Sequence, residues 1–274
     1  MSKTLTLAKM DEPLTIRWSR PLPDGAALST VTVSCDTAGR YFVSILVEEE
    51  IALLPPVIST VGIDLGLHDT VVLDTGEKVG NLKFFQTDEQ RLAKYQRRLA
   101  KKQKGSRNRT KACLKVARIH ARITDRRRDF LHKLSTRIIR ENQTICVESL
   151  QLKAMVKHPT LAKAIHDVGW GEFVRQLNYK STWYGRTLVA IDKWYPSSKR
   201  CFDCGHVLGS LSLDTRQWIC PQCGSAHDRD VNAANAARNI LAAGLAVSAY
   251  GEAVRPGRVR PPSAGLAEVG IPRL

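Results

Sequence analysis

Four cysteines in the last third of the chain have the spacing of a metal site. Two residues separate Cys201 from Cys204, two separate Cys220 from Cys223, and fifteen lie between the pairs. A CxxC loop brings two thiolates close enough to share one ion, and two such loops complete the tetrahedron of a structural Zn²⁺ site. The alternatives are four unrelated thiols or two disulfides. The other cysteines are scattered, which favours a reducing compartment over a secreted disulfide scaffold.

Asp64 lies in an alternating segment, VGIDLGL (61–67), which predicts a strand. Its apolar residues face one way, whereas Gly62, Asp64 and Gly66 face the other. An acid flanked on its own face by glycines lies where a bulky ligand could approach the backbone. A second strand, TVVLD, and a turn at residues 74–76 indicate a meander. The alternative is that Asp64 is an ordinary strand-end or turn residue.

Glu148 and Asp230 are the other acids that could share a site. Glu148 ends the apolar strand TICVESL (144–150), and strand ends are where open α/β sheets expose their sites. A helix starting near Asp228 places Asp230 on one stripe with Ala234, Ala237 and Leu241. A carboxylate on such a packed face is unfavourable unless a cation or donors compensate it. The alternatives are a surface strand-end Glu148 and a capping role for Asp230, although we expect Asp228 to be the cap.

Converging carboxylates of this kind bind hard divalent cations, Mg²⁺ or Mn²⁺, through oxygen. Two ions roughly 3.5–4 Å apart can stabilise the attacking water and the leaving oxygen of a phosphodiester. Acids alone would repel a nucleic acid, but the ions reverse that field. The joint arrangement of Asp64, Glu148 and Asp230 therefore predicts a metal-dependent phosphodiesterase site.

The charge of the chain is concentrated in one segment. The 274 residues carry a net charge of +16, and residues 91–140 hold 19 Lys and Arg against two acids. Two long helical patterns cover this region, with apolar stripes on one side and cations on the other. A polyanion is the expected partner. The alternative is a charged coiled coil that binds protein, but the near absence of acids argues against it.

The remaining segments give a coarse map. Residues 14–50 predict a small antiparallel β unit, with the first thirteen residues loose, and Thr87–Gln90 matches a capping box. Residues 159–185 predict one or two amphipathic helices that stop at Gly185, and residues 186–194 predict another strand. Residues 245–274 are rich in Pro, Gly and Arg and predict a disordered tail. Without a signal-like start or a long apolar run, a soluble cytoplasmic protein without membrane contact is expected.

These segments together resemble one protein family. VGIDLGLHDT, ICVESL, GWGEF, YPSSK, CFDCG…RQWICPQCG and HDRDVNAA, with weaker likeness in RWSRPLPDG and TVTVSCDTAGRYFVSILVEEE, are similar to the TnpB (OrfB) proteins of insertion sequences. These are relatives of the compact type V CRISPR effectors. The resemblance implies an α/β fold: an RNase H-like (RuvC) mixed sheet with an inserted basic helical hairpin (87–141) and a zinc ribbon, preceded by a small antiparallel β unit.

The resemblance also implies a division of the chain. Residues 1–60 correspond to a partial wedge-like β unit, 61–199 to the nuclease core, 200–226 to the zinc ribbon, 227–244 to the final RuvC segment and 245–274 to the tail. Full-length members carry a larger N-terminal region with a helical recognition insert. We expect most of that region to be lacking here, since some 60 residues precede Asp64. Those parts read the flanking DNA motif and hold the guide–target duplex, so impaired targeting is expected.

By resemblance, the catalytic triad maps onto Asp64, Glu148 and Asp230, which bind two Mg²⁺ (or Mn²⁺) ions, and the four spaced cysteines hold structural Zn²⁺. The implied activity is RNA-guided cleavage of DNA with a guide RNA from the element, in the prokaryotic cytoplasm at the nucleoid. The candidate phosphate contacts are Arg97, Arg98, Lys101, Lys102, Arg126, Arg127 and Arg128. The rival hypotheses are a non-cleaving RNA- and DNA-binding regulator, a guide-free structure-specific nuclease such as a junction resolvase, and an inert remnant.

Overall fold

The computed structural model describes residues 4–7, 9–23, 25–191, 195–212 and 214–242. The predicted tail, 245–274, lies outside the described residues. The chain divides into two compact units. Of the described residues, the first unit contains those within 4–51 and 90–122, and the second contains those within 52–89 and 123–242. Both long helices have residues in each unit.

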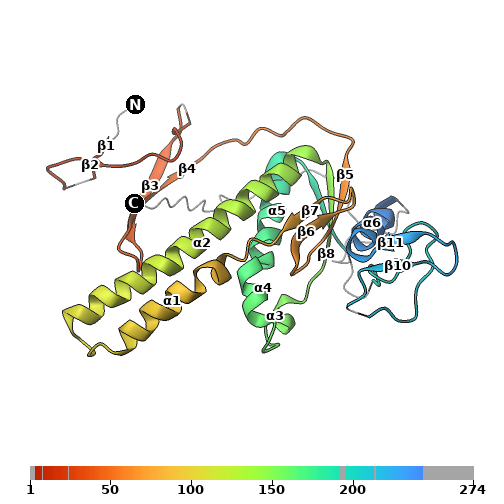
Figure 1. The fold of residues 1–274 in the computed structure, drawn as a ribbon. Coiled ribbons are helices and arrows are strands. Elements are labelled where there is room, and N and C mark those ends of the chain that lie inside the picture. Colours follow the sequence, from red (N-terminus) through yellow and green to blue (C-terminus); the bar gives the residue numbers. More distant parts are fainter. Residues whose placement is uncertain (1–3, 8, 24, 192–194, 213, 243–274) are drawn as a thin grey trace. The chain divides into compact units, whose positions relative to one another are not determined.

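The second unit is built on a five-stranded sheet (Figure 1). Its strands lie in the order β7-β6-β5-β8-β9. The neighbouring strands β5, β8 and β9 pair in parallel, whereas β6 pairs antiparallel with both β5 and β7 and so runs opposite to the other strands of this sheet. Their bounds are β5 Thr60–Asp64, β6 Asp69–Leu73, β7 Lys78–Gly80, β8 Thr144–Glu148 and β9 Thr187–Ile191. The predicted α/β class with a mixed sheet is therefore confirmed.

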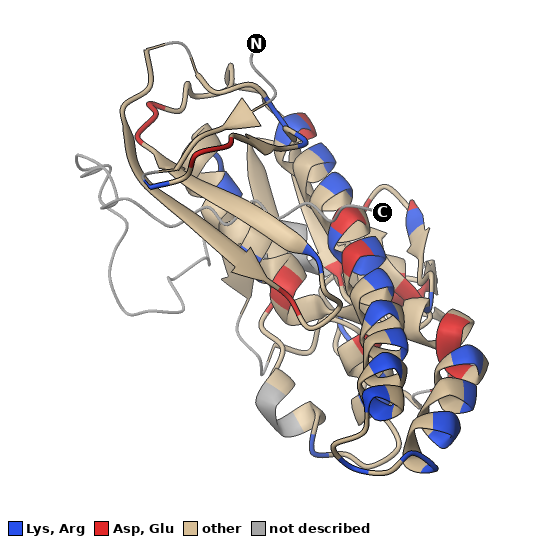
Figure 2. Ribbon diagram, turned by 90° about the vertical axis from the view of Figure 1, so that its left-hand side faces the viewer, with Lys and Arg blue, Asp and Glu red and all other residues tan. Residues whose placement is uncertain are grey.

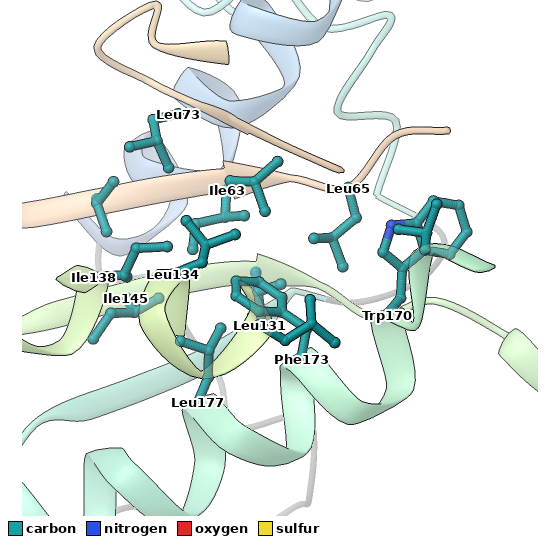
Figure 3. Packing of buried hydrophobic residues seen from close by; sticks show 14 of the residues in the cluster. Ile63, Leu65, Leu73, Leu131, Leu134, Ile138, Ile145, Trp170, Phe173 and Leu177 are labelled. Atoms are coloured by element: carbon teal, nitrogen blue, oxygen red, sulfur yellow. The ribbon is translucent and has the colours of Figure 1, made fainter. Parts of the chain in front are cut away.

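One face of the sheet carries the main core, as Figure 3 shows. Ile63 on β5 and Ile145 on β8 are fully buried there. They pack against two helices, α2 (Arg107–Glu141) and α5 (Trp170–Tyr184), through residues such as Leu131 and Phe173. Because alternate residues of a strand face opposite sides, Gly62 and Asp64 point away from this core. Helix α6 (Arg229–Ala242) packs there against β5, β6 and β8.

The helices largely follow the predicted patterns. The remaining ones are α1 Phe84–Ala100, α3 Leu152–Met155 and α4 Ala162–Val168. Gly169, with φ of 75°, separates α4 from α5, and Gly185, with φ of 68°, ends α5 as predicted. None of the helices in the described ranges has an apolar stretch long enough to cross a bilayer.

The start of α1 differs from the expected capping box. The helix begins at Phe84, three residues before Thr87, and the Thr87 hydroxyl donates to the Lys83 carbonyl at 3.1 Å instead of capping. The cap comes from another helix: both carboxylate oxygens of Asp167 on α4 accept the backbone N–H of Phe85, at 2.8 and 3.0 Å. A tertiary contact thus takes the place of the expected local cap. The negative charge of Asp167 is also favourable there, because it lies at the positive end of the helix dipole.

The first unit contains two strand pairs and the outer halves of the long helices. Strand β1 (Thr4–Leu5) pairs with β2 (Leu14–Thr15), and β3 (Leu28–Cys35) pairs with β4 (Tyr41–Val47), all antiparallel. The expectation that the first thirteen residues are loose is therefore wrong for β1, which forms ladder hydrogen bonds with β2. The guanidinium of Arg109 donates to the Leu99 and Lys102 carbonyls and closes the turn between α1 and α2.

Candidate metal centres and nucleic-acid surface

The four spaced cysteines meet in one place. All four Sγ atoms lie within 4.8 Å of one another, with Cys201 to Cys223 at 3.7 Å and Cys204 to Cys220 at 3.6 Å. These separations are far above a disulfide bond length, and the thiols are free. The cluster argues against both alternatives, unrelated thiols and disulfides. A tetrahedral set of soft sulfur ligands at this spacing fits Zn²⁺.

Two matching turns and a short hairpin hold the thiols. The N–H of Gly205 donates to the Cys201 carbonyl and that of Gly224 to the Cys220 carbonyl, both at 2.9 Å. Both glycines have a positive φ, 79° and 75°, which residues with a Cβ atom rarely adopt. Strands β10 (Gln217–Ile219) and β11 (Ala226–Asp228) pair antiparallel and lead directly into α6. The thiol cluster is therefore joined to the start of the helix that carries Asp230.

A buried histidine on β11 touches the thiol cluster, and the sequence reasoning missed it. Nε2 of His227 lies 3.1 Å from Cys201 Sγ, and its ring packs against those of Phe202 and Trp218. Cys201, Asp203 and His227 also bring one ligand atom each within 4.8 Å of the others. In the sequence, His227 stands alone, seven residues after Cys220. This separation does not by itself indicate a metal ligand.

Asp64 and Glu148 emerge together from the sheet. They are the last residues of the neighbouring parallel strands β5 and β8, whose register pairs Ile63 with Val147. The carboxyl ends of parallel strands share one edge, so both acids lie at that edge. Asp230 is in the first turn of α6, which packs against both strands. The structure thus brings three acids, 166 residues apart in sequence, to one edge of the sheet.

The electrostatics of Asp64 show how closely the acids interact. Burial, together with the negative charges of Glu148 and Asp230, raises the pKa of Asp64 to about 8, against a smaller lowering by Arg229. A carboxyl group with such a pKa is an acid whose charge lacks compensation. Among the described residues, the three acids do not bring their oxygens within the 4.8 Å spacing that the thiols meet. Carboxylate oxygens are the donors that hard divalent cations prefer.

Asp228 is a helix cap, as predicted. Its Oδ1 accepts the backbone N–H groups of Asp230 and Val231 at 3.1 and 3.2 Å, while its Oδ2 accepts Lys78 Nζ at 2.6 Å. The hydrogen bond from Lys78 and those from the two backbone N–H groups hold the pKa of Asp228 below its usual value, although burial opposes them. Because Asp228 caps the helix, Asp230 does not serve as the cap, and its Oδ2 instead pairs with Arg216 Nη1 at 3.4 Å.

Two further polar residues contact the site. Ser197 is buried, and its hydroxyl donates to Oε1 of Glu148. Asn232, two residues after Asp230 on α6, is fully buried and donates to the Ser197 and Arg200 carbonyls. Neither was predicted as a site residue. Asn232 follows Asp230 in a D-x-N pattern, which is a usable cue, whereas Ser197 has no periodic or spacing signal.

The basic residues follow the two long helices, as Figure 2 shows. Five of the seven candidate phosphate contacts are exposed, namely Arg97, Arg98, Lys101, Lys102 and Arg128. Arg126 and Arg127 are partly buried and have internal partners. Arg126 pairs with Asp88 at 3.1 Å, and Arg127 donates to the His166 carbonyl at 2.8 Å. The exposed residues are the stronger candidates for nucleic-acid contact, because Arg126 and Arg127 already help to hold α2 to its neighbours.

Comparisons with known proteins agree with these features. Residues 43–158 match the OrfB_IS605 family, described as "Probable transposase", and residues 170–240 match the family described as "Cas12f1-like, TNB domain". A protein of Streptomyces pristinaespiralis named "Putative RNA-guided DNA endonuclease" is 59% identical over 254 residues, which cover 93% of this chain and 62% of that protein. InsQ of Escherichia coli (strain K12), with the same printed description, is 36% identical over 84% of this chain and 59% of its own length.

The chain thus spans about three fifths of the length of these curated relatives. The fold is also similar to a solved structure, titled "Cryo-EM structure of CRISPR-Cas12f Ternary Complex". That match has a TM-score of 0.50 at 17% identity and covers 76% of this chain and 44% of the other. The chain belongs to the TnpB (OrfB) family, which is related to the type V CRISPR effectors.

Proposed function

We propose that this chain is an RNA-guided DNA endonuclease of a transposable element that hydrolyses phosphodiester bonds with divalent metal ions. The observation that carries the proposal is that Asp64 and Glu148 end neighbouring parallel strands, that the helix of Asp230 packs against both strands, and that burial and the charges of the other two acids raise the pKa of Asp64 to about 8. Such uncompensated negative charge suits Mg²⁺ or Mn²⁺. The names of the curated relatives point to the same activity.

The five-stranded sheet with acids at the ends of β5 and β8 supports an RNase H-like (RuvC) core. In this proposal the residues 61–199 and 227–244 form the nuclease, 1–60 a wedge-like unit and 200–226 a zinc ribbon. Cys201, Cys204, Cys220 and Cys223 would hold Zn²⁺ and fix the ribbon beside the start of α6. The boundaries follow the family pattern, and the thiol cluster supports the ribbon assignment.

The residues around the three acids have separate parts in the proposed reaction. Two divalent ions, when bound, would activate the attacking water and stabilise the leaving oxygen. Asp64 must lose its proton before it can act as an oxygen ligand, so ion binding releases a proton near neutral pH. Ser197 holds one oxygen of Glu148, and Asp228 caps α6, so Asp230 is not needed as the cap and can turn from Arg216 to an ion. The exposed cations of α1 and α2 attract the nucleic acid over long range.

Cleavage assays with matched variants test the proposal. The full chain is purified with its genomic neighbourhood co-expressed, any retained RNA is sequenced, and DNA matching that RNA is offered with and without Mg²⁺. We expect Mg²⁺-dependent cleavage by the wild type and none by Asp64→Ala. Asp214→Asn, at an exposed position, serves as the control for loss of one charge. Equal behaviour of wild type and Asp64→Ala would instead support a non-cleaving regulator, and cleavage of branched DNA without RNA a guide-free nuclease.

A further inference from the structure

We propose that Ser197 is a positioning residue for Glu148, and that Asn232 fixes Ser197 from the thiol-cluster side. This inference depends on the proposed metal-binding role of Glu148. Ser197 has a relative exposure of 5%, and its hydroxyl donates to Oε1 of Glu148. A buried donor on one carboxylate oxygen limits the rotation of the side chain and leaves the other oxygen to a cation. The residue therefore acts through Glu148 and not on the substrate.

Asn232 ties the segment that contains Ser197 to helix α6. Its amide nitrogen donates to the carbonyls of Ser197 at 3.2 Å and Arg200 at 2.8 Å, and its amide oxygen accepts the N–H of Phe202 at 3.1 Å. One fully buried side chain thus satisfies three backbone groups between residues 197 and 202. Phe202 directly follows Cys201, so the same segment enters the four-thiol cluster.

These contacts form a continuous path between the two metal centres. The path runs from the backbone beside Cys201 through Asn232 to the Ser197 backbone, and from the Ser197 hydroxyl to Glu148. All of these groups belong to the second unit. Asn232 also lies two positions from Asp230, so a displacement of the thiol-cluster segment would disturb two of the three acids. Hydrogen-bonded partners of metal ligands typically change metal affinity 10–100-fold when removed.

The test measures Mn²⁺ binding to the full chain without nucleic acid, by calorimetry and by the loss of the free-ion electron paramagnetic resonance signal. The Mn²⁺ that Asp64→Ala still binds is taken as binding at sites other than the three acids. We expect Ser197→Ala to raise the Kd for Mn²⁺ about tenfold. Ser197→Thr retains the hydroxyl and should restore affinity to within about threefold of the wild type. Ser198→Ala, the same change one residue along at a half-buried position, is the matched control and should bind as the wild type does.

A double-mutant cycle tests the path from Asn232. Asn232→Asp keeps the volume and the acceptor but loses the donated hydrogen bonds, and we expect it to weaken Mn²⁺ binding. When Asn232→Asp is added to Ser197→Ala, the Kd for Mn²⁺ should rise by less than about a further twofold, because both changes release the same carboxylate of Glu148. If the two effects on the Kd are fully additive, Asn232 does not act through Ser197. If Ser197→Ala binds Mn²⁺ as tightly as the wild type does, Ser197 does not position Glu148, while the proposed function stands. If the wild type binds no more Mn²⁺ than Asp64→Ala does, both the inference and the proposed function fail.

Discussion

Replacement of Asp64 by asparagine should stabilise the protein in the absence of divalent ions. The carboxyl group lies at the end of β5 beside two other acids, and burial and those acids raise its pKa from 3.8 to about 8. In the unfolded chain the same group ionises freely. Folding therefore requires Asp64 either to take up a proton or to keep an unfavourable charge. Asparagine has almost the same shape and carries no charge, so it removes this opposition to folding.

The size of the effect follows from the pKa difference. The pKa of Asp64 is 3.8 in the unfolded chain and about 8 in the folded chain. This difference opposes folding at pH 7 by about 4 kcal/mol, because each pH unit between 3.8 and 7 contributes about 1.36 kcal/mol. Partial exposure of the site screens the charges, and the new amide must find hydrogen-bond partners, which together reduce the gain to about 2–3 kcal/mol. For a chain of this size, that gain raises Tm by about 4–12 °C.

The pH dependence has a definite sign. Below pH 3.8 both states bind the proton, so the site makes no difference to stability. Between pH 3.8 and about 8 the folded state binds more protons than the unfolded state, so the wild type loses stability as pH rises. The advantage of Asp64→Asn should therefore grow over this interval and level off above it. Urea denaturation followed by circular dichroism, at several pH values after removal of free divalent ions on a chelating resin, measures it.

The control and the ion dependence make the test strict. Asp214→Asn removes one negative charge at an exposed position and should change stability by less than about 0.5 kcal/mol. Mg²⁺ should stabilise the wild type by an amount that grows with the logarithm of its concentration above the Kd, but should stabilise Asp64→Asn much less. An asparagine variant that is less stable than the wild type near neutral pH, or an advantage that does not change with pH, would refute the reasoning.

Three further changes separate the roles of other residues. Cys220→Ser should abolish stoichiometric zinc and unfold the β10–β11 hairpin, as measured by metal content and by circular dichroism. Asp167→Ala removes the cap on the Phe85 N–H and should lower the free energy of unfolding by about 1–2 kcal/mol in urea denaturation, with Asp214→Asn as reference. The pair Arg97→Gln and Lys101→Gln should weaken nucleic-acid binding and reduce the slope of log K against log salt by about 2, without changing Tm. An unchanged salt slope would contradict contact at these positions.

The strand-end positions of Asp64 and Glu148 and the helical position of Asp230 were predictable because strand parity and helix periodicity are local properties. Alternation in residues 61–67 puts Asp64 on the face opposite Ile63, and the apolar run before Glu148 indicates a buried strand. The sequence alone does not say that β5 and β8 are neighbours; the register between Ile63 and Val147 decides that. The cysteine spacing was also local, so the thiol cluster followed from it directly.

The residues that escaped prediction act through contacts between distant segments. Asp167 caps a helix that begins more than eighty residues earlier, so the local match at Thr87 misled the assignment of the helix start. Ser197 reaches Glu148 across 49 residues, and nothing in its neighbourhood indicates a partner. Serine and aspartate are common, and only the folded chain determines which of them meet.

The basic segment shows why a charge count cannot assign individual contacts. Arg126 and Arg127 lie in the same cationic run as Arg97, and the sequence gives all three the same interpretation. In the folded chain, however, Arg126 pairs with Asp88 and lies over the Phe84 ring at 5.4 Å, whereas Arg97 is exposed. An arginine with a partly buried carboxylate partner has already been desolvated for that partner, so removing it should affect stability more than the salt dependence of binding. Arg126→Gln should therefore lower Tm and leave the salt slope unchanged, the reverse of the result expected for Arg97→Gln.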